Sequence, residues 1–185
     1  ELSMSEENPA QVFDVGRVLS DNGPHGLVLR AAVSDEMYEL IATPSVAVKI
    51  MSIGDENAGV LCRKVESLIH ITLHASLVKY HGAWLVPGGD VWIVSDLCES
   101  GSIADIIHAA KVRDPLVLEG IASYVMRNVL LAVDFLHSND ICHGDLRAKN
   151  FLVDGRGHVK MGDYGVYDVL ETVMKPRTCY PGARL

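Results

Sequence analysis

The sequence predicts an α+β fold of two lobes, in which a β-rich first half with one main helix precedes the first part of a helical lobe. From Phe13 to about Val94, apolar residues form short β-branched or aromatic runs separated by Gly, Pro, Asn and Asp. After Asp96, helical periodicity dominates the pattern. The expected parts are a polar leader at 1–12, an N-terminal lobe at 13–95 and a partial C-terminal lobe at 96–185.

Five runs in the first half have the composition of β-strands, and they lie at residues 16–20, 26–33, 45–51, 77–86 and 90–97. One helical stretch at 58–72 interrupts them, because its apolar residues recur at steps of three and four positions. These residues are Val60, Leu61, Val65, Leu68 and Ile69. The pattern therefore predicts a sheet that carries one main helix.

The second half begins with a short helix, for which Ser102 and Asp105 form the S-x-x-D pattern of a capping box. A long helix is predicted at 116–137, with an inward stripe made of Ile121, Val125, Val129, Val133 and Leu136. Two β runs follow at 151–154 and 158–163, and the glycines at 155 and 157 favour a hairpin turn between them.

Composition excludes several classes of function. The formal net charge is −8 and no run of five cations occurs, which argues against a nucleic-acid partner. The four cysteines form no C-x-x-C pair, so we expect reduced thiols and no zinc site. No run reaches the ~18 apolar residues of a membrane span. We expect a cytoplasmic protein, or the cytoplasmic part of a larger one, with no membrane segment in this chain.

The most informative stretch is residues 141–166, where Asp145, Asn150 and Asp163 are interleaved with glycines and β runs. An isolated polar octamer such as "HGDLRAKN" is typical of a plain loop. If the two β runs pair as a hairpin, however, all three side chains emerge at one end of it. Upstream, Lys49 lies in an apolar strand, where its amine must reach solvent or meet a negative charge.

These residues resemble the protein kinase superfamily. "VAVK" is similar to the V-A-I-K strand, "HGDLRAKN" to the H-R-D-L-x-x-x-N loop, and "GDYG" to the D-F-G motif, in the same order. The resemblance runs from about Phe13 to Leu185. The A-P-E element and later helices of that family are not in the sequence, so we expect a C-terminally truncated piece, roughly the first two-thirds of such a domain.

The resemblance implies ATP and Mg²⁺ as cofactors and a role for each polar residue. Lys49 would hold the α- and β-phosphates, while Asn150 and Asp163 would bind Mg²⁺. Asp145 would orient the substrate hydroxyl and accept its proton, and Arg147 would lie beside the transferred phosphate.

The resemblance also implies a nucleotide slot. Its residues would be Gly23, Gly26 and Val28 in the phosphate-covering loop, Ala47 above the purine, Leu152 below it, and backbone groups of Asp96 to Cys98. Asp21 occupies the place of the first glycine of that loop, so we expect weakened nucleotide binding. His143 and Tyr164 are interpreted as packing residues between the lobes.

Two departures affect regulation. Gly144 replaces the arginine before the catalytic aspartate, and we expect no switching through phosphorylation at Thr172 or Thr178. The helix position that normally supplies a glutamate to the lysine falls on Val65, with Glu66 one residue further. Glu66 then either pairs with Lys49 after a local shift, or the pair is absent.

Two functions remain open from the sequence. One is a protein kinase that transfers the ATP γ-phosphate to a protein hydroxyl; mixed STE20-type and tyrosine-kinase-like features leave the choice of Ser/Thr or Tyr undecided. The alternative is a pseudokinase that serves as a regulatory or scaffold module for a partner domain and binds nucleotide weakly or not at all. The latter is similar to the kinase-homology region of receptor guanylyl cyclases, which lacks the aspartate present here as Asp145.

Overall fold

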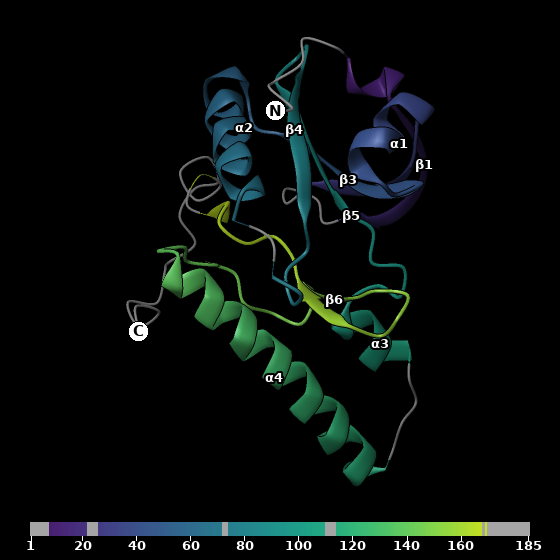
Figure 1. Cartoon of the computed structure of the whole chain (residues 1–185), viewed down its shortest axis with the longest axis vertical. Helices are drawn as coiled ribbons and strands as arrows, with labels where there is room; N and C mark the ends of the chain where they lie inside the picture. Colours follow the sequence, from purple (N-terminus) through teal and green to yellow (C-terminus); the bar gives the residue numbers. More distant parts are fainter. Residues whose placement is uncertain (1–7, 22–25, 72–73, 110–113, 168, 170–185) are drawn as a thin grey trace.

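The computed structural model describes residues 8–21, 26–71, 74–109, 114–167 and 169, which form two lobes joined after Asp96 (Figure 1). The first lobe is built on a sheet and the second on helices and a small hairpin. One buried apolar cluster runs through both lobes, from Tyr80 and Ile93 in the sheet to Leu136 and Tyr164 in the second lobe. The predicted α+β, two-lobed architecture is confirmed.

The sheet has five antiparallel strands in the order β1-β2-β3-β5-β4. The strands are β1 (Phe13–Asp21), β2 (Leu27–Val33), β3 (Ser45–Ser52), β4 (Tyr80–Val86) and β5 (Asp90–Asp96). All five predicted runs form strands, although β1 begins earlier and β4 later than predicted. The central strand β3 carries Lys49, which lies opposite Val28 of β2 and Ile93 of β5.

The predicted helix of the first lobe is α2 (Asp55–Ile69), which buries Leu61, Val65 and Leu68 against the sheet. A second helix, α1 (Asp35–Ile41), was not predicted. Its N-cap is Ser34, whose hydroxyl accepts a hydrogen bond from the Met37 amide at 3.4 Å. A 3₁₀ turn, η1 (Pro9–Gln11), also lies within the predicted polar leader.

Helices α1 and α2 flank the sheet on opposite sides (Figure 1). Met37 and Ile41 of α1 join a separate buried cluster with Phe13, Val46, Val48, Trp84 and others. The first lobe therefore has three layers, with α2 as its one main helix, as predicted, and the shorter α1 as an unpredicted addition.

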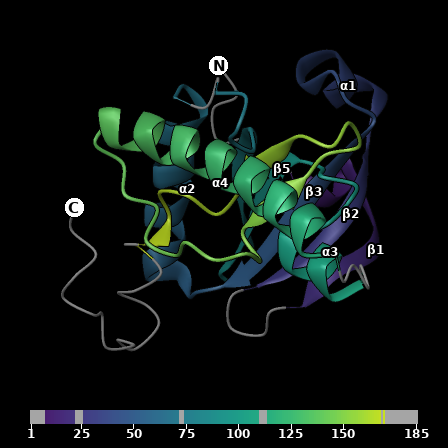
Figure 2. The same cartoon turned by 90° about the horizontal axis from the view of Figure 1, so that it is seen from below.

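The second lobe contains α3 (Ile103–Ala109), α4 (Pro115–Ser138) and a hairpin of β6 (Phe151–Val153) and β7 (Val159–Met161). Seen from below, α4 crosses beneath the sheet (Figure 2). The predicted capping box starts α3: Asp105 N–H donates to Ser102 Oγ at 3.1 Å, and Ser102 N–H donates to Asp105 Oδ2 at 3.3 Å.

Helix α4 buries Val125, Val129, Ala132 and Leu136 in the core. Ile121, which was predicted to face inward, is 39% exposed, so the buried stripe starts one turn later. By length and composition α4 could also cross a membrane. Core helices share those two properties, and α4 supplies core residues here, so this observation does not establish a membrane segment.

Candidate functional site

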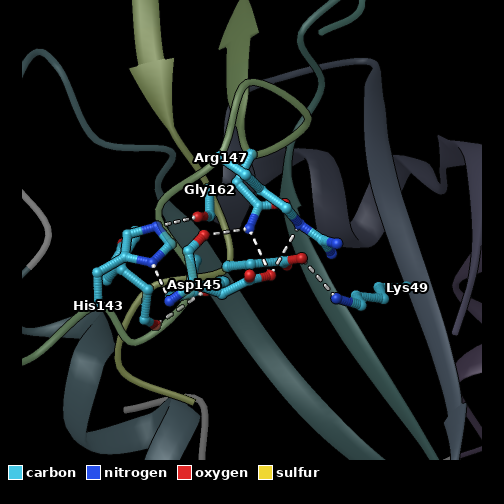
Figure 3. Close-up of polar contacts among 9 residues, drawn as sticks. Lys49, His143, Asp145, Arg147 and Gly162 are labelled. Carbon is cyan, nitrogen blue, oxygen red and sulfur yellow. Dashed lines mark hydrogen bonds and ion pairs between the residues drawn. The ribbon is translucent and has the colours of Figure 1, made fainter. Parts of the chain in front are cut away.

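The site is centred on an ion pair between the two lobes. Lys49 Nζ donates to Asp163 Oδ2 at 2.7 Å, and the two side chains are 11% and 37% exposed (Figure 3). Strand β3 carries the amine, and the carboxylate follows the end of β7 at a residue with a left-handed φ of 56°. Of the two outcomes that the sequence left open for this lysine, solvent or a negative charge, the structure shows the second.

The charge of Lys49 keeps Asp163 ionised. Burial alone would raise the pKa of Asp163, but the Lys49 charge and hydrogen bond, with smaller contributions from His143 and Arg147, together lower it. An ionised carboxylate is the form that binds a hard cation.

Asp145 and Asn150 are joined directly within one loop. Asn150 Nδ2 donates to the Asp145 carbonyl at 2.8 Å and to Asp145 Oδ2 at 3.0 Å. Because the amide nitrogen is used in these bonds, the orientation of the Asn150 side chain is fixed. Its Oδ1 accepts no hydrogen bond from the part of the chain that the structure describes.

His143 links this loop to the segment before Asp163. The Asp145 N–H donates to His143 Nδ1 at 3.2 Å, and His143 Nε2 lies 2.9 Å from the Gly162 carbonyl (Figure 3). Since Nδ1 accepts, Nε2 carries the proton and donates it to Gly162. Burial lowers the pKa of His143, in agreement with a neutral ring. Both of its hydrogen bonds lie within the second lobe, so its predicted packing between the lobes stays a prediction.

Arg147 approaches the same carboxylate. Its Nε lies 2.9 Å from Asp145 Oδ2, and the two side chains are partly buried. The contact is an ion pair without hydrogen-bond geometry, since Nε is buried and has no hydrogen-bond partner among the described residues. Arg147 therefore lies beside Asp145; its expected place next to the transferred phosphate stays a prediction.

The proposed slot residues of the first lobe share one face of the sheet. Val28 lies directly opposite Lys49, and Ala47 is two residues before it, so all three side chains point to the same side. Gly26 has a φ of +98°, and a Cβ there would lie 2.7 Å from the Ile50 carbonyl oxygen. Only glycine fits at this position. Gly23 lies outside the described residues.

Leu152 lies in β6 and is half-buried. The connector Asp96–Cys98 starts at the last residue of β5. The Asp96 N–H donates to the Lys79 carbonyl at 2.9 Å, so of the two backbone polar groups of Asp96 the N–H is already engaged within the protein. The Cys98 N–H has no hydrogen-bond partner in the described ranges. It can serve as a backbone donor.

In the described part of the chain, Glu66 does not pair with Lys49. Val65 is fully buried in α2, and Glu66 forms no ion pair with Lys49 within the described residues. One step along a helix is about 100° of rotation, enough to direct Glu66 away from the lysine. The pair is absent, and Asp163 alone neutralises Lys49 in that part of the chain.

The hydrogen bonds that hold Tyr164 were not predicted from the sequence. The Tyr164 hydroxyl donates to the Val78 carbonyl at 2.6 Å, and the Tyr80 hydroxyl donates to the Tyr164 carbonyl at 3.3 Å. The two rings also contact each other, with centroids 4.8 Å apart. No sequence pattern indicated that Tyr80 and Tyr164 would contact each other, because they lie 84 positions apart.

A cavity of about 550 Å³ lies beside the connector, between α4 and the β6–β7 turn. It is lined by Asp96, Glu99, Asn128 and Lys160 among others. Neither Lys49 nor Asp163 lines it, so this cavity is distinct from the ion-pair site.

A five-stranded lobe that presents a lysine to an aspartate of a helical lobe, next to a loop with Asp145 and Asn150, defines a two-lobed kinase fold. The chain belongs to the protein kinase domain family, whose model matches residues 30–180. Its relatives include the serine/threonine-protein kinase dst4 of Dictyostelium discoideum, 30% identical over 178 residues. Misshapen-like kinase 1 of Rattus norvegicus is 24% identical over 180 residues. Each alignment covers 95% of this chain, but only 34% and 13% of the relatives.

Proposed function

We propose that this domain is an ATP-dependent protein kinase that transfers the γ-phosphate to a protein hydroxyl. The observation that carries the proposal is the 2.7 Å contact between Lys49 and Asp163 across the two lobes. Phosphoryl transfer depends on positioning and on neutralising phosphate charge, and a lysine beside an ionised carboxylate supplies both.

The donor set fits Mg²⁺ bound together with a nucleotide. Mg²⁺ takes one or two protein oxygens and completes its shell with phosphate oxygens and waters. Asp163 offers an ionised carboxylate and Asn150 an uncommitted amide oxygen. The bound metal would neutralise charge on the phosphates.

Asp145 is the residue we propose to receive the proton of the acceptor hydroxyl. Its Oδ2 is held by Asn150 and Arg147, whereas Oδ1 has no hydrogen-bond partner among the described residues. Lys49 holds the α- and β-phosphates, and Arg147 adds positive charge beside the acceptor. The relative dst4 is named a serine/threonine-protein kinase, which supports serine or threonine as the acceptor.

The alternative is a pseudokinase that regulates a partner domain. The absence of a Glu66–Lys49 pair among the described residues favours it, because that pair is part of an assembled active kinase. Gly144 also favours the pseudokinase, because it replaces the arginine that would pair with a phosphorylated segment. We also propose a cytoplasmic location, which is compatible with both functions.

The deciding experiment measures thermal stability with ATP, with Mg²⁺ and with both, on the parent protein that contains this domain. Stabilisation of about 2–3 kcal/mol corresponds to ligand at ~100 times its dissociation constant. We expect stabilisation by the combination, and loss of its metal-dependent part in Asp163→Ala. Asp145→Asn should retain binding and lose transfer to protein. Binding without transfer in the unaltered protein would favour the pseudokinase; no binding at all would refute the proposed kinase.

A further inference from the structure

Tyr167 lies directly on the backbone of the loop that carries Asp145. A Cβ built on Gly144 would be 2.6 Å from Tyr167 Cβ and 2.7 Å from its Cγ and Cδ1. Real Cβ atoms do not approach other carbons so closely, so the two residues are matched: glycine leaves the space that tyrosine fills. Gly144 also has a φ of +84°, which strains any other residue.

This contact is the second of two that fasten the segment around Asp163 to the same loop. The first is the hydrogen bond from His143 to the Gly162 carbonyl at 2.9 Å. Gly162 precedes Asp163 and Tyr167 follows it, while His143 and Gly144 immediately precede Asp145. The two aspartates are therefore held relative to each other by contacts on both sides of Asp163. We call this pair of contacts the clamp.

We propose that Tyr167 is a positioning residue, which fixes Asp163 relative to Asp145 by packing on Gly144 and needs no phosphate to do so. At position 144 the family resemblance implied an arginine, which would order the following segment by pairing with a phosphorylated residue. The contact between the Tyr167 ring and the Gly144 backbone involves no charged group and does not depend on phosphorylation. The catalytic consequence rests on the proposed function, whereas the ordering of the loop does not.

Hydrogen exchange tests the ordering without any activity. The Asp145 amide donates to His143 Nδ1 and the Gly162 amide to the Asn150 carbonyl, so both report on the clamp. In the parent protein, Tyr167→Ala should speed their exchange about tenfold, because local opening exposes these amides. Tyr167→Phe keeps the ring and should restore slow exchange. Tyr38→Ala, an exposed tyrosine of α1, is the control and should change neither amide. Unchanged exchange in Tyr167→Ala would overturn the proposal.

A double-mutant cycle tests the contact itself. Gly144→Ala should lower the melting temperature more in the unaltered background than in Tyr167→Gly, where the colliding Cβ is gone. The backbone strain at position 144 is the same in both backgrounds and cancels. Equal effects of Gly144→Ala in the two backgrounds would contradict the matched fit.

Kinetics then test the catalytic consequence. Tyr167→Ala should lower kcat about tenfold through misplacement of Asp163 relative to Asp145, and Tyr167→Phe should recover kcat. Phosphatase treatment should leave the unaltered protein equally active. Loss of activity on that treatment would overturn the phosphate-free role. A complete lack of transfer in the unaltered protein would refute the proposed function, and the exchange result would still decide the role of Tyr167.

Discussion

Lys49 and Asp163 lie 114 positions apart in sequence, yet their charged atoms approach to 2.7 Å and join the two lobes. Lys49 is only 11% exposed, so its ammonium has little water to replace a lost partner. The contact therefore serves the fold as well as the proposed chemistry.

The first prediction concerns that ion pair. A double-mutant cycle with Lys49→Met and Asp163→Asn should give a coupling of about 1 kcal/mol, since solvent at the 37% exposed carboxylate screens the interaction. Denaturant unfolding measures it. The matched control pairs Lys49→Met with Glu66→Gln, for which additive effects are expected because no ion pair joins these described residues. Additivity in the first cycle would contradict the structure.

The second prediction concerns Tyr164. Phenylalanine is the residue of the family motif at this position, yet Tyr164→Phe should destabilise this protein. The change leaves the Val78 carbonyl without the Tyr164 hydroxyl in a buried site, at a cost of about 1–2 kcal/mol. Urea unfolding should show this destabilisation as a lower midpoint concentration for Tyr164→Phe. Tyr38→Phe, at an exposed site, should alter it little, and equal midpoints for both variants would argue against the hydrogen bond.

The third prediction separates crowding from strain at two glycines. Gly26 and Gly88 have φ values of +98° and +105°, but only Gly26 faces neighbouring atoms, since nothing lies within 4 Å of a Cβ at Gly88. Gly88→Ala should cost about 1–2 kcal/mol for the left-handed backbone alone. Gly26→Ala should cost more, because its Cβ would meet the Ile50 carbonyl oxygen at 2.7 Å. Thermal unfolding of both variants gives the difference, and similar losses would exclude the close approach.

The fourth prediction is a pH dependence that originates at His143. Burial lowers its pKa in the folded protein, so below about pH 6.5 the unfolded chain binds more protons than the folded one. The stabilisation is therefore fully present above that pH and is lost as the pH falls towards the folded pKa. Unfolding in urea at pH 7.5 and 5.5 measures this loss, which should shrink in His143→Gln. An undiminished loss in His143→Gln would contradict the assignment to His143.

The elements with long or regular patterns were predictable from sequence. The five strands, α2, α4 and the hairpin followed from periodicity and turn residues, and the Ser102–Asp105 cap followed from its spacing. For Lys49 the sequence narrowed the outcome to solvent or a negative charge, because an amine in an apolar strand needs one of the two. These features depend on local chemistry or on a single physical requirement.

The missed features depend on short length or on three-dimensional placement. Helix α1 spans only seven residues, fewer than a periodicity window needs, and its signals were Ser34 and the acidic first turn. Whether Glu66 reaches Lys49 depends on the rotation of α2 about its axis. The fit of Tyr167 to Gly144 depends on how the chain returns after β7, which no local pattern reports.

The connector between the lobes is fastened at almost every residue. Asp96 is bound to the Lys79 carbonyl and to His81, the Cys98 carbonyl accepts from Gly101, and Glu99 accepts from the Gly155 amide. In the described part of the chain, Leu97 alone within Asp96–Cys98 has no hydrogen bond. The backbone of Leu97 is therefore the least restrained within these three residues, and a proline at this position would fix its φ near about −65°.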